Sequence, residues 1–118
     1  MNDPVLHDCI QRYLAYLTAD YRQSLHDDLD SKDFLVEYGT KYARVYSIDR
    51  RDPSQQRYAH SFIVLKDAVL ATGAAASFQR GDILKAASWA SPARNFSRGT
   101  VFSQSSYTSR VTWAGVIQ

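Results

Sequence analysis

Apolar residues in the first part of the chain recur every third or fourth position, with polar residues between them. The recurring positions are Leu6, Ile10, Tyr13, Leu14, Leu17 and Tyr21. This spacing places them along one face of an α-helix. Asp3 can cap the free N–H groups at the start of that helix, and Pro4 suits its first position. The pattern predicts an amphipathic helix over about residues 4–20.

From residue 34 onwards the apolar residues alternate with polar ones, which is typical of strands. Phe34, Val36 and Tyr38 alternate, and Gly39-Thr40 can form a turn before a second strand around Val45. The pattern therefore predicts a strand, a turn and a strand in this part of the chain.

Further strands are expected after a polar loop at 49–56. Residues 58–65, YAHSFIVL, are aromatic and β-branched and become apolar on both faces, which favours a central strand. Residues 68–77, AVLATGAAAS, have no clear period, and we expect an inserted loop or a frayed helical turn there. Shorter strands are expected at 78–86, 100–102 and 111–115.

Together these elements predict one domain over residues 1–118, with the helix at about 4–20 and a strand-rich remainder at 34–117. The predicted fold class is α+β, with an N-terminal amphipathic helix packed on a mostly antiparallel sheet of four to six strands. Hydrophobic residues make up 45% of the chain and charged residues 22%, which is typical of a folded domain rather than a disordered one.

Charge is separated along the chain, although the formal net charge is only +2. Residues 1–38 contain three basic and eight acidic residues, whereas residues 39–118 contain eleven basic and four acidic ones. A basic region favours an anionic partner. The alternative is that it pairs with the acidic segment 27–37, within one monomer or between two subunits.

The sequence also gives indications of the cellular compartment of the protein. Cys9 is the single cysteine, so no intrachain disulfide can form. The first residues, MNDPVLHDC, lack the basic and apolar regions of a signal peptide. No apolar run approaches the roughly 20 residues of a membrane span. We expect a soluble intracellular protein that does not associate with a membrane.

Motifs for catalysis are missing from the sequence. It contains no HExxH, CxxC, GxSxG or P-loop pattern. The acidic loop resembles a calcium loop only in part, because Lys32 stands where a ligand is needed and the glycine is missing. His60 lies within a predicted strand and is expected to be structural. We therefore expect a protein that is not an enzyme and has no metal or cofactor.

Basic and aromatic residues are interleaved in the segment GDILKAASWASPARNFSRG. Cations that meet phosphates, together with aromatic faces that stack on bases, are typical of single-stranded nucleic-acid binding. The alternative is that Trp89 and Phe96 belong to the core. We expect the basic side chains to share one outer face of the fold. The predicted nucleic-acid-binding residues are Lys85, Trp89, Arg94, Arg98, Lys41 and Arg44.

Several stretches between residues 38 and 102 resemble a recurrent kind of small bacteriophage-encoded protein. The stretches are YGTKY at 38–42, AHSFI at 59–63, GDILKAASW at 81–89, PAR at 92–94 and RG at 98–99. The resemblance implies a phage origin and a location in the cytoplasm of the host bacterium. It brings no established reaction or cofactor with it.

Three functions follow as hypotheses. The first is a nonenzymatic nucleic-acid-binding module that acts through the basic, aromatic-containing surface. The second is a phage factor that binds a host protein, and inhibits a host enzyme or defence complex, through its tyrosines or through acidic charge that imitates nucleic acid. The third is a virion or assembly component in a homo-oligomer. A homodimer would use the helix at 4–20.

Overall fold

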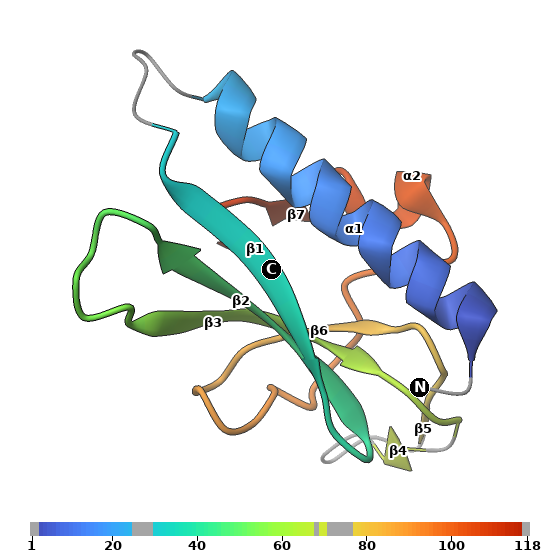
Figure 1. Ribbon diagram of the computed structural model, residues 1–118. Helices are drawn as coiled ribbons and strands as arrows, with labels where there is room; N and C mark the ends of the chain where they lie inside the picture. Colours follow the sequence, from blue (N-terminus) through green and yellow to red (C-terminus); the bar gives the residue numbers. More distant parts are fainter. Residues whose placement is uncertain (1–2, 25–29, 68, 71–76, 117–118) are drawn as a thin grey trace.

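The computed structural model describes residues 3–24, 30–67, 69–70 and 77–116. One long helix lies across one face of an antiparallel four-stranded sheet, as Figure 1 shows. The predicted α+β class is therefore confirmed, including the N-terminal helix and the antiparallel pairing.

Helix α1 spans Pro4–Gln23, three residues longer than the sequence pattern predicts. Asp3 caps it, because Oδ1 accepts a hydrogen bond from Leu6 N–H at 3.1 Å. At the other end, the Ser24 hydroxyl donates to the Tyr21 carbonyl at 2.7 Å. All six residues of the predicted apolar stripe are buried, so this face of α1 packs against the sheet.

The main sheet has the strand order β1-β2-β3-β6, and each neighbouring pair is antiparallel. Its strands are β1 Lys32–Tyr38, β2 Tyr42–Asp49, β3 Arg57–Val64 and β6 Ile83–Lys85. The register shifts between Val45 and Tyr46, which lie opposite Ser61 and Ala59. His60 is therefore the extra residue of a β-bulge in β3.

The remaining elements are short. They are β4 Val69–Leu70, β5 Ser77–Phe78, α2 Gln104–Tyr107, β7 Val111–Thr112 and β8 Gly115–Val116. Strand β4 lies within the region expected to be a loop and pairs with β5, which begins at the end of that region. Residues 68 and 71–76 lie outside the described residues. The strand expected at 100–102 is reduced to single bridges at Thr100. There the Ser106 hydroxyl accepts from Thr100 N–H at 2.9 Å, which favours a turn.

Two apolar clusters fill the two sides of the sheet. The larger lies between α1 and the sheet and includes Val45 and Ile63. The smaller contains Phe62, Val64, Phe78 and Leu84 on the opposite face. None of the helices in the described part of the chain combines the length and apolar character needed to cross a bilayer.

Candidate functional site

Arg98 is buried, and the expectation that it lies on an outer face is wrong. Its side chain has no exposed surface, and Nη1 donates to Asn95 Oδ1 at 2.8 Å and to the Phe96 carbonyl at 2.9 Å. The Arg98 backbone N–H donates to the Ile83 carbonyl at 2.8 Å, which ties this residue to β6. The backbone bond to β6 and the two contacts within the 95–98 segment hold the guanidinium inward.

Lys85 lies on the opposite sheet face from Arg44. Lys85 is paired with Ser61, whose hydroxyl contacts Tyr13 of α1. Arg44 is paired with Phe62, which belongs to the cluster on the other face. Opposed residues in an antiparallel pair share a face, so these two predicted site residues are separated by the sheet.

Arg94 is exposed in the segment after β6. No ion pair forms between it and any residue that the structure describes. It is available to solvent, and no contact in the described part of the chain joins its side chain to the other predicted site residues.

Trp89 and Arg44 are brought together, and a third residue joins them. Arg44 Nε donates to the Trp89 carbonyl at 2.8 Å, and its Cζ lies 4.3 Å from the indole centroid. Arg57 Cζ lies 4.8 Å from the same ring, and Tyr46 meets it edge-on at 5.7 Å. The indole therefore holds two guanidinium groups and does not offer a free stacking surface.

Glu37 connects the same two arginines. One carboxylate oxygen accepts from Arg44 Nη1, and the other lies 3.5 Å from Arg57 Nη1. We call the group Glu37, Arg44, Tyr46, Arg57 and Trp89 the tryptophan cluster. Its two positive charges and one negative charge leave it with a net charge of +1.

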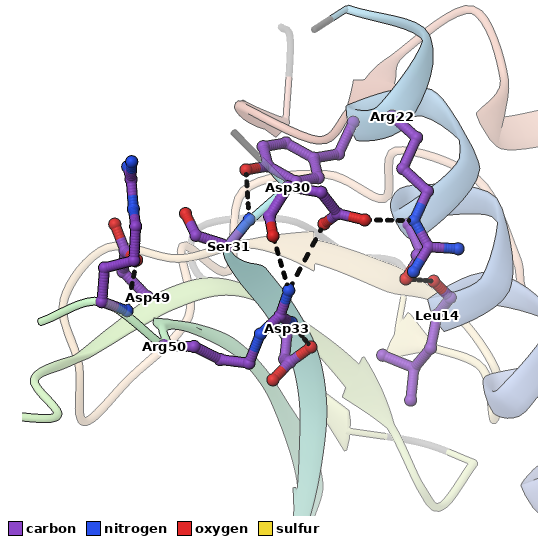
Figure 2. A network of polar contacts seen from close by, with 10 residues as sticks. Leu14, Arg22, Asp30, Ser31, Asp33, Asp49 and Arg50 are labelled. Carbon is purple, nitrogen blue, oxygen red and sulfur yellow. Dashed lines mark hydrogen bonds and ion pairs between the residues drawn. The ribbon is translucent and has the colours of Figure 1, made fainter. Parts of the chain in front are cut away.

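Other residues of the acidic segment are also paired with arginines, as Figure 2 shows. Asp30 Oδ2 accepts from Arg22 Nε at 2.9 Å, while Asp30 Oδ1 lies 3.6 Å from Arg50. Arg50 also pairs with Asp33 and donates to the Asp30 carbonyl at 2.7 Å. Residues 27–29 lie outside the described residues. The acidic and basic regions thus neutralise each other in part within one monomer.

A groove opens beside the tryptophan cluster, with a volume of about 610 Å³. Tyr42 and Phe62 line it and meet edge-on with their ring centroids 6.1 Å apart. Lys41, Lys66 and Arg44 supply its positive charge, and Glu37 its negative charge. A shallower hollow of about 350 Å³ lies on the other side of the cluster, lined by Arg57, Trp89 and Ala86 among others.

The two lysines of the groove are positioned by backbone contacts. Gly39 N–H donates to the Tyr42 carbonyl at 2.8 Å and closes the hairpin that carries Lys41. Leu65 N–H donates to the Lys41 carbonyl at 2.9 Å, which brings Lys66 beside that hairpin. Neither lysine has a carboxylate within 4 Å among the described residues. Lys66 is not among the residues predicted from the sequence, where its only signal is its place after a buried strand.

A second polar group lies inside the fold. The Ser61 hydroxyl is 2.8 Å from the Tyr13 hydroxyl and 2.9 Å from His60 Nδ1. His60 Nε2 is 2.8 Å from the Thr112 carbonyl, to which it donates. Burial lowers the pKa of His60, so the neutral imidazole accepts from Ser61. Ser61 has no exposed surface, so its hydroxyl joins α1, β3 and β7 inside the fold.

Comparison with protein-family models assigns the chain to a family. It belongs to a family of unknown function (DUF7717), whose model matches residues 4–118. No curated protein and no solved structure gives a significant match. The groove, the tryptophan cluster and the buried polar group all lie within the matched residues, so they are parts of this family's domain as it occurs in this chain.

Proposed function

We propose that this member of the family binds single-stranded nucleic acid, without catalysing a reaction, on the sheet face that carries the groove. The observation that carries the proposal is the pair of lysines, Lys41 and Lys66, beside the half-buried ring of Tyr42. Cations without an internal partner are available to phosphates, and aromatic groups beside them can contact bases.

The shape of this surface favours a single strand over a duplex. Readers of duplex DNA commonly insert a helix into the major groove. Here the apolar face of α1 is buried against the sheet, and α2 has only four residues. An open groove beside a sheet instead suits an extended strand, whose bases are accessible.

The positive side chains extend along the sheet. Lys41 precedes β2, and Arg57 pairs with Ile48 near the other end of that strand. At about 3.3 Å per residue, this distance corresponds to roughly 23 Å along β2. Four cations, Lys41, Lys66, Arg44 and Arg57, line the two hollows along this path. A short oligonucleotide would contact several of them at once.

One alternative is a protein whose acidic residues imitate the charge of nucleic acid. Asp30, Asp33 and Glu37 each form an ion pair with an arginine of this chain. Their charge is therefore partly compensated, which supports the nucleic-acid proposal over charge mimicry. The resemblance to phage-encoded proteins supports action in the cytoplasm of an infected bacterium.

The experiment is fluorescence anisotropy with labelled single-stranded DNA and RNA, and with duplexes, at several salt concentrations. We expect single strands to bind more tightly than duplexes and affinity to fall as salt rises. Substituting Lys41→Ala and Lys66→Ala together removes two phosphate contacts. The slope of log affinity against log salt should then become shallower by about 1.4, which is about 0.7 per contact.

The matched control is Lys85→Ala, which removes a lysine on the opposite sheet face and should leave both affinity and salt slope unchanged. If no single strand binds at low salt, the proposal fails. It fails equally if the Lys85 variant loses as much affinity as the groove variant, because binding would then depend on overall charge.

A further inference from the structure

Arg98 carries a feature that the groove does not explain. Its side chain has no exposed surface, yet Nε and Nη2 have no hydrogen-bond partner. Buried polar groups are nearly always paired, and a buried charge without compensation is costly. The unpaired part of this guanidinium therefore points to a group that is supplied from outside the chain.

The way in which Arg98 is held shows what such a group must be. Nη1 donates to Asn95 Oδ1 and to the Phe96 carbonyl, at 2.8 and 2.9 Å. The Phe96 ring covers one face of the guanidinium, with its centroid 3.8 Å from Cζ. The edge formed by Nε and Nη2 remains. These two donors match the spacing of two oxygens in a phosphate or carboxylate group.

Charge selects between those two oxyanions. Burial lowers the pKa of Arg98, and the positive charge of Arg110 lowers it further. Arg110 is exposed, and in the described ranges no carboxylate forms an ion pair with either arginine. Two uncompensated positive charges favour a dianion over a monoanion. A phosphomonoester is the common biological dianion with this geometry.

We propose that Arg98, assisted by Arg110, binds a phosphomonoester group through this edge, and that the Phe96 ring over the guanidinium face holds the side chain in its closed position in the free protein. Phe96 is 44% exposed, so its ring can turn into solvent without opening the core. Inorganic phosphate and the terminal phosphate of a nucleotide or oligonucleotide share this chemistry. The site is separate from the groove, so it does not rest on the proposed function.

The test is a titration of the full chain with inorganic phosphate at constant ionic strength. The Nε–H signals of the arginines are followed by NMR, and the melting temperature is measured in parallel. We expect one arginine signal to shift until saturation. Arg110→Gln should weaken phosphate binding about fivefold by removing one charge. Phe96→Ala should strengthen it about tenfold, because the closed form is no longer favoured.

Arg94→Gln is the matched control, since Arg94 is an exposed arginine in the same segment, and it should leave phosphate binding unchanged. Arg98→Gln should abolish binding. If that variant does not fold, the substitutions at the exposed Phe96 and Arg110 still decide the question. The absence of a saturable shift, or unchanged affinity in both of those variants, would overturn the proposal and leave Arg98 as a structural residue.

The source of the phosphate is identified by comparing inorganic phosphate, a nucleoside monophosphate and oligonucleotides with a 5′-phosphate or a 5′-hydroxyl. A gain for the 5′-phosphorylated oligonucleotide that Arg110→Gln removes would assign the site to a nucleic-acid end. Tightest binding of the nucleoside monophosphate would assign it to a free nucleotide. Equal binding of all phosphate forms would assign it to the phosphate group alone.

Discussion

Arg44 and Trp89, which are 45 residues apart in the sequence, are joined both by a hydrogen bond and by a ring contact. Arg44 Nε donates to the Trp89 carbonyl at 2.8 Å, and Arg44 Cζ lies 4.3 Å from the indole centroid. The pair fastens the loop that follows β6 to the centre of the main sheet. It also fixes one wall of the groove.

Removing the indole should therefore affect both stability and binding. We expect Trp89→Ala to lower the free energy of unfolding by about 2 kcal/mol, because an aromatic surface and its contacts with two arginines are lost. Oligonucleotide affinity should also fall, because Arg44 and Arg57 lose the indole ring that positions their guanidinium groups. Urea denaturation and anisotropy measure the two effects.

Phe102→Ala is the control for this substitution, because Phe102 is a half-exposed aromatic residue with Arg80 Cζ 4.8 Å from its ring. It should leave oligonucleotide affinity unchanged. Retention of full affinity in the Trp89 variant would show that the tryptophan cluster does not position the binding surface.

Glu37 competes with any anion for Arg44 and Arg57. Substituting Glu37→Gln should raise oligonucleotide affinity about threefold, which corresponds to the ~0.7 kcal/mol of a half-exposed ion pair. The free energy of unfolding should change little. Asp33→Asn removes a carboxylate that pairs with Arg50, outside the groove, and should leave affinity unchanged. An equal gain in both variants would indicate a general charge effect.

The buried hydroxyl of Ser61 forms hydrogen bonds with both Tyr13 and His60. Removing it should therefore lower the free energy of unfolding more than removing the polar group of one of these neighbours. Tyr13→Phe should lower the free energy of unfolding by about 1 kcal/mol. Ser61→Ala should lower it by about 3 kcal/mol, because it leaves both Tyr13 and His60 unpaired. In the double variant the cost should be less than the sum. Urea denaturation tests this, and strict additivity would argue against the network.

His60 should make the stability depend on pH. Burial lowers its pKa in the folded state, so the unfolded chain binds the proton more readily. The resulting stabilisation is complete above the unfolded pKa of about 6.5 and is lost as pH falls towards the lower folded value. We expect the free energy of unfolding to fall below pH 6.5 by at most ~1.4 kcal/mol per pH unit.

The check is a series of denaturation curves between pH 8 and pH 5, together with NMR titration of the imidazole. His60→Gln should have a flatter profile over this range because it has no group to titrate. If the imidazole titrates at or above 6.5 in the folded protein, the buried neutral form is excluded.

The helix and the long strands could be predicted because their signals are local. The stripe from Leu6 to Tyr21 and the alternation after Phe34 each follow the period of one element. The positions of the charged residues could not be predicted in the same way. The β-bulge beside Val45 changes which side chains point towards α1, and nothing in the local sequence marks it.

The residues of the candidate site were likewise predicted only in part. Lys41 and Arg44 were predicted, and the structure places both in one groove. Lys66 was missed because its neighbour, the hairpin at 39–41, is distant in the sequence. Lys85 and Arg98 were grouped with Trp89 because they are close in the sequence. In the fold, strand register places Lys85 on the other face, and the 95–98 segment turns Arg98 inward.

The sequence by itself determined that this chain forms a capped amphipathic helix and an antiparallel sheet, because hydrophobic period and capping chemistry act over a few residues. Only the tertiary structure decided which cations remain available. Ion pairing between distant segments neutralises Arg44, Arg50 and Arg57 in part, and burial removes Arg98 from the surface. Both effects depend on distances between elements, which strand order and register determine.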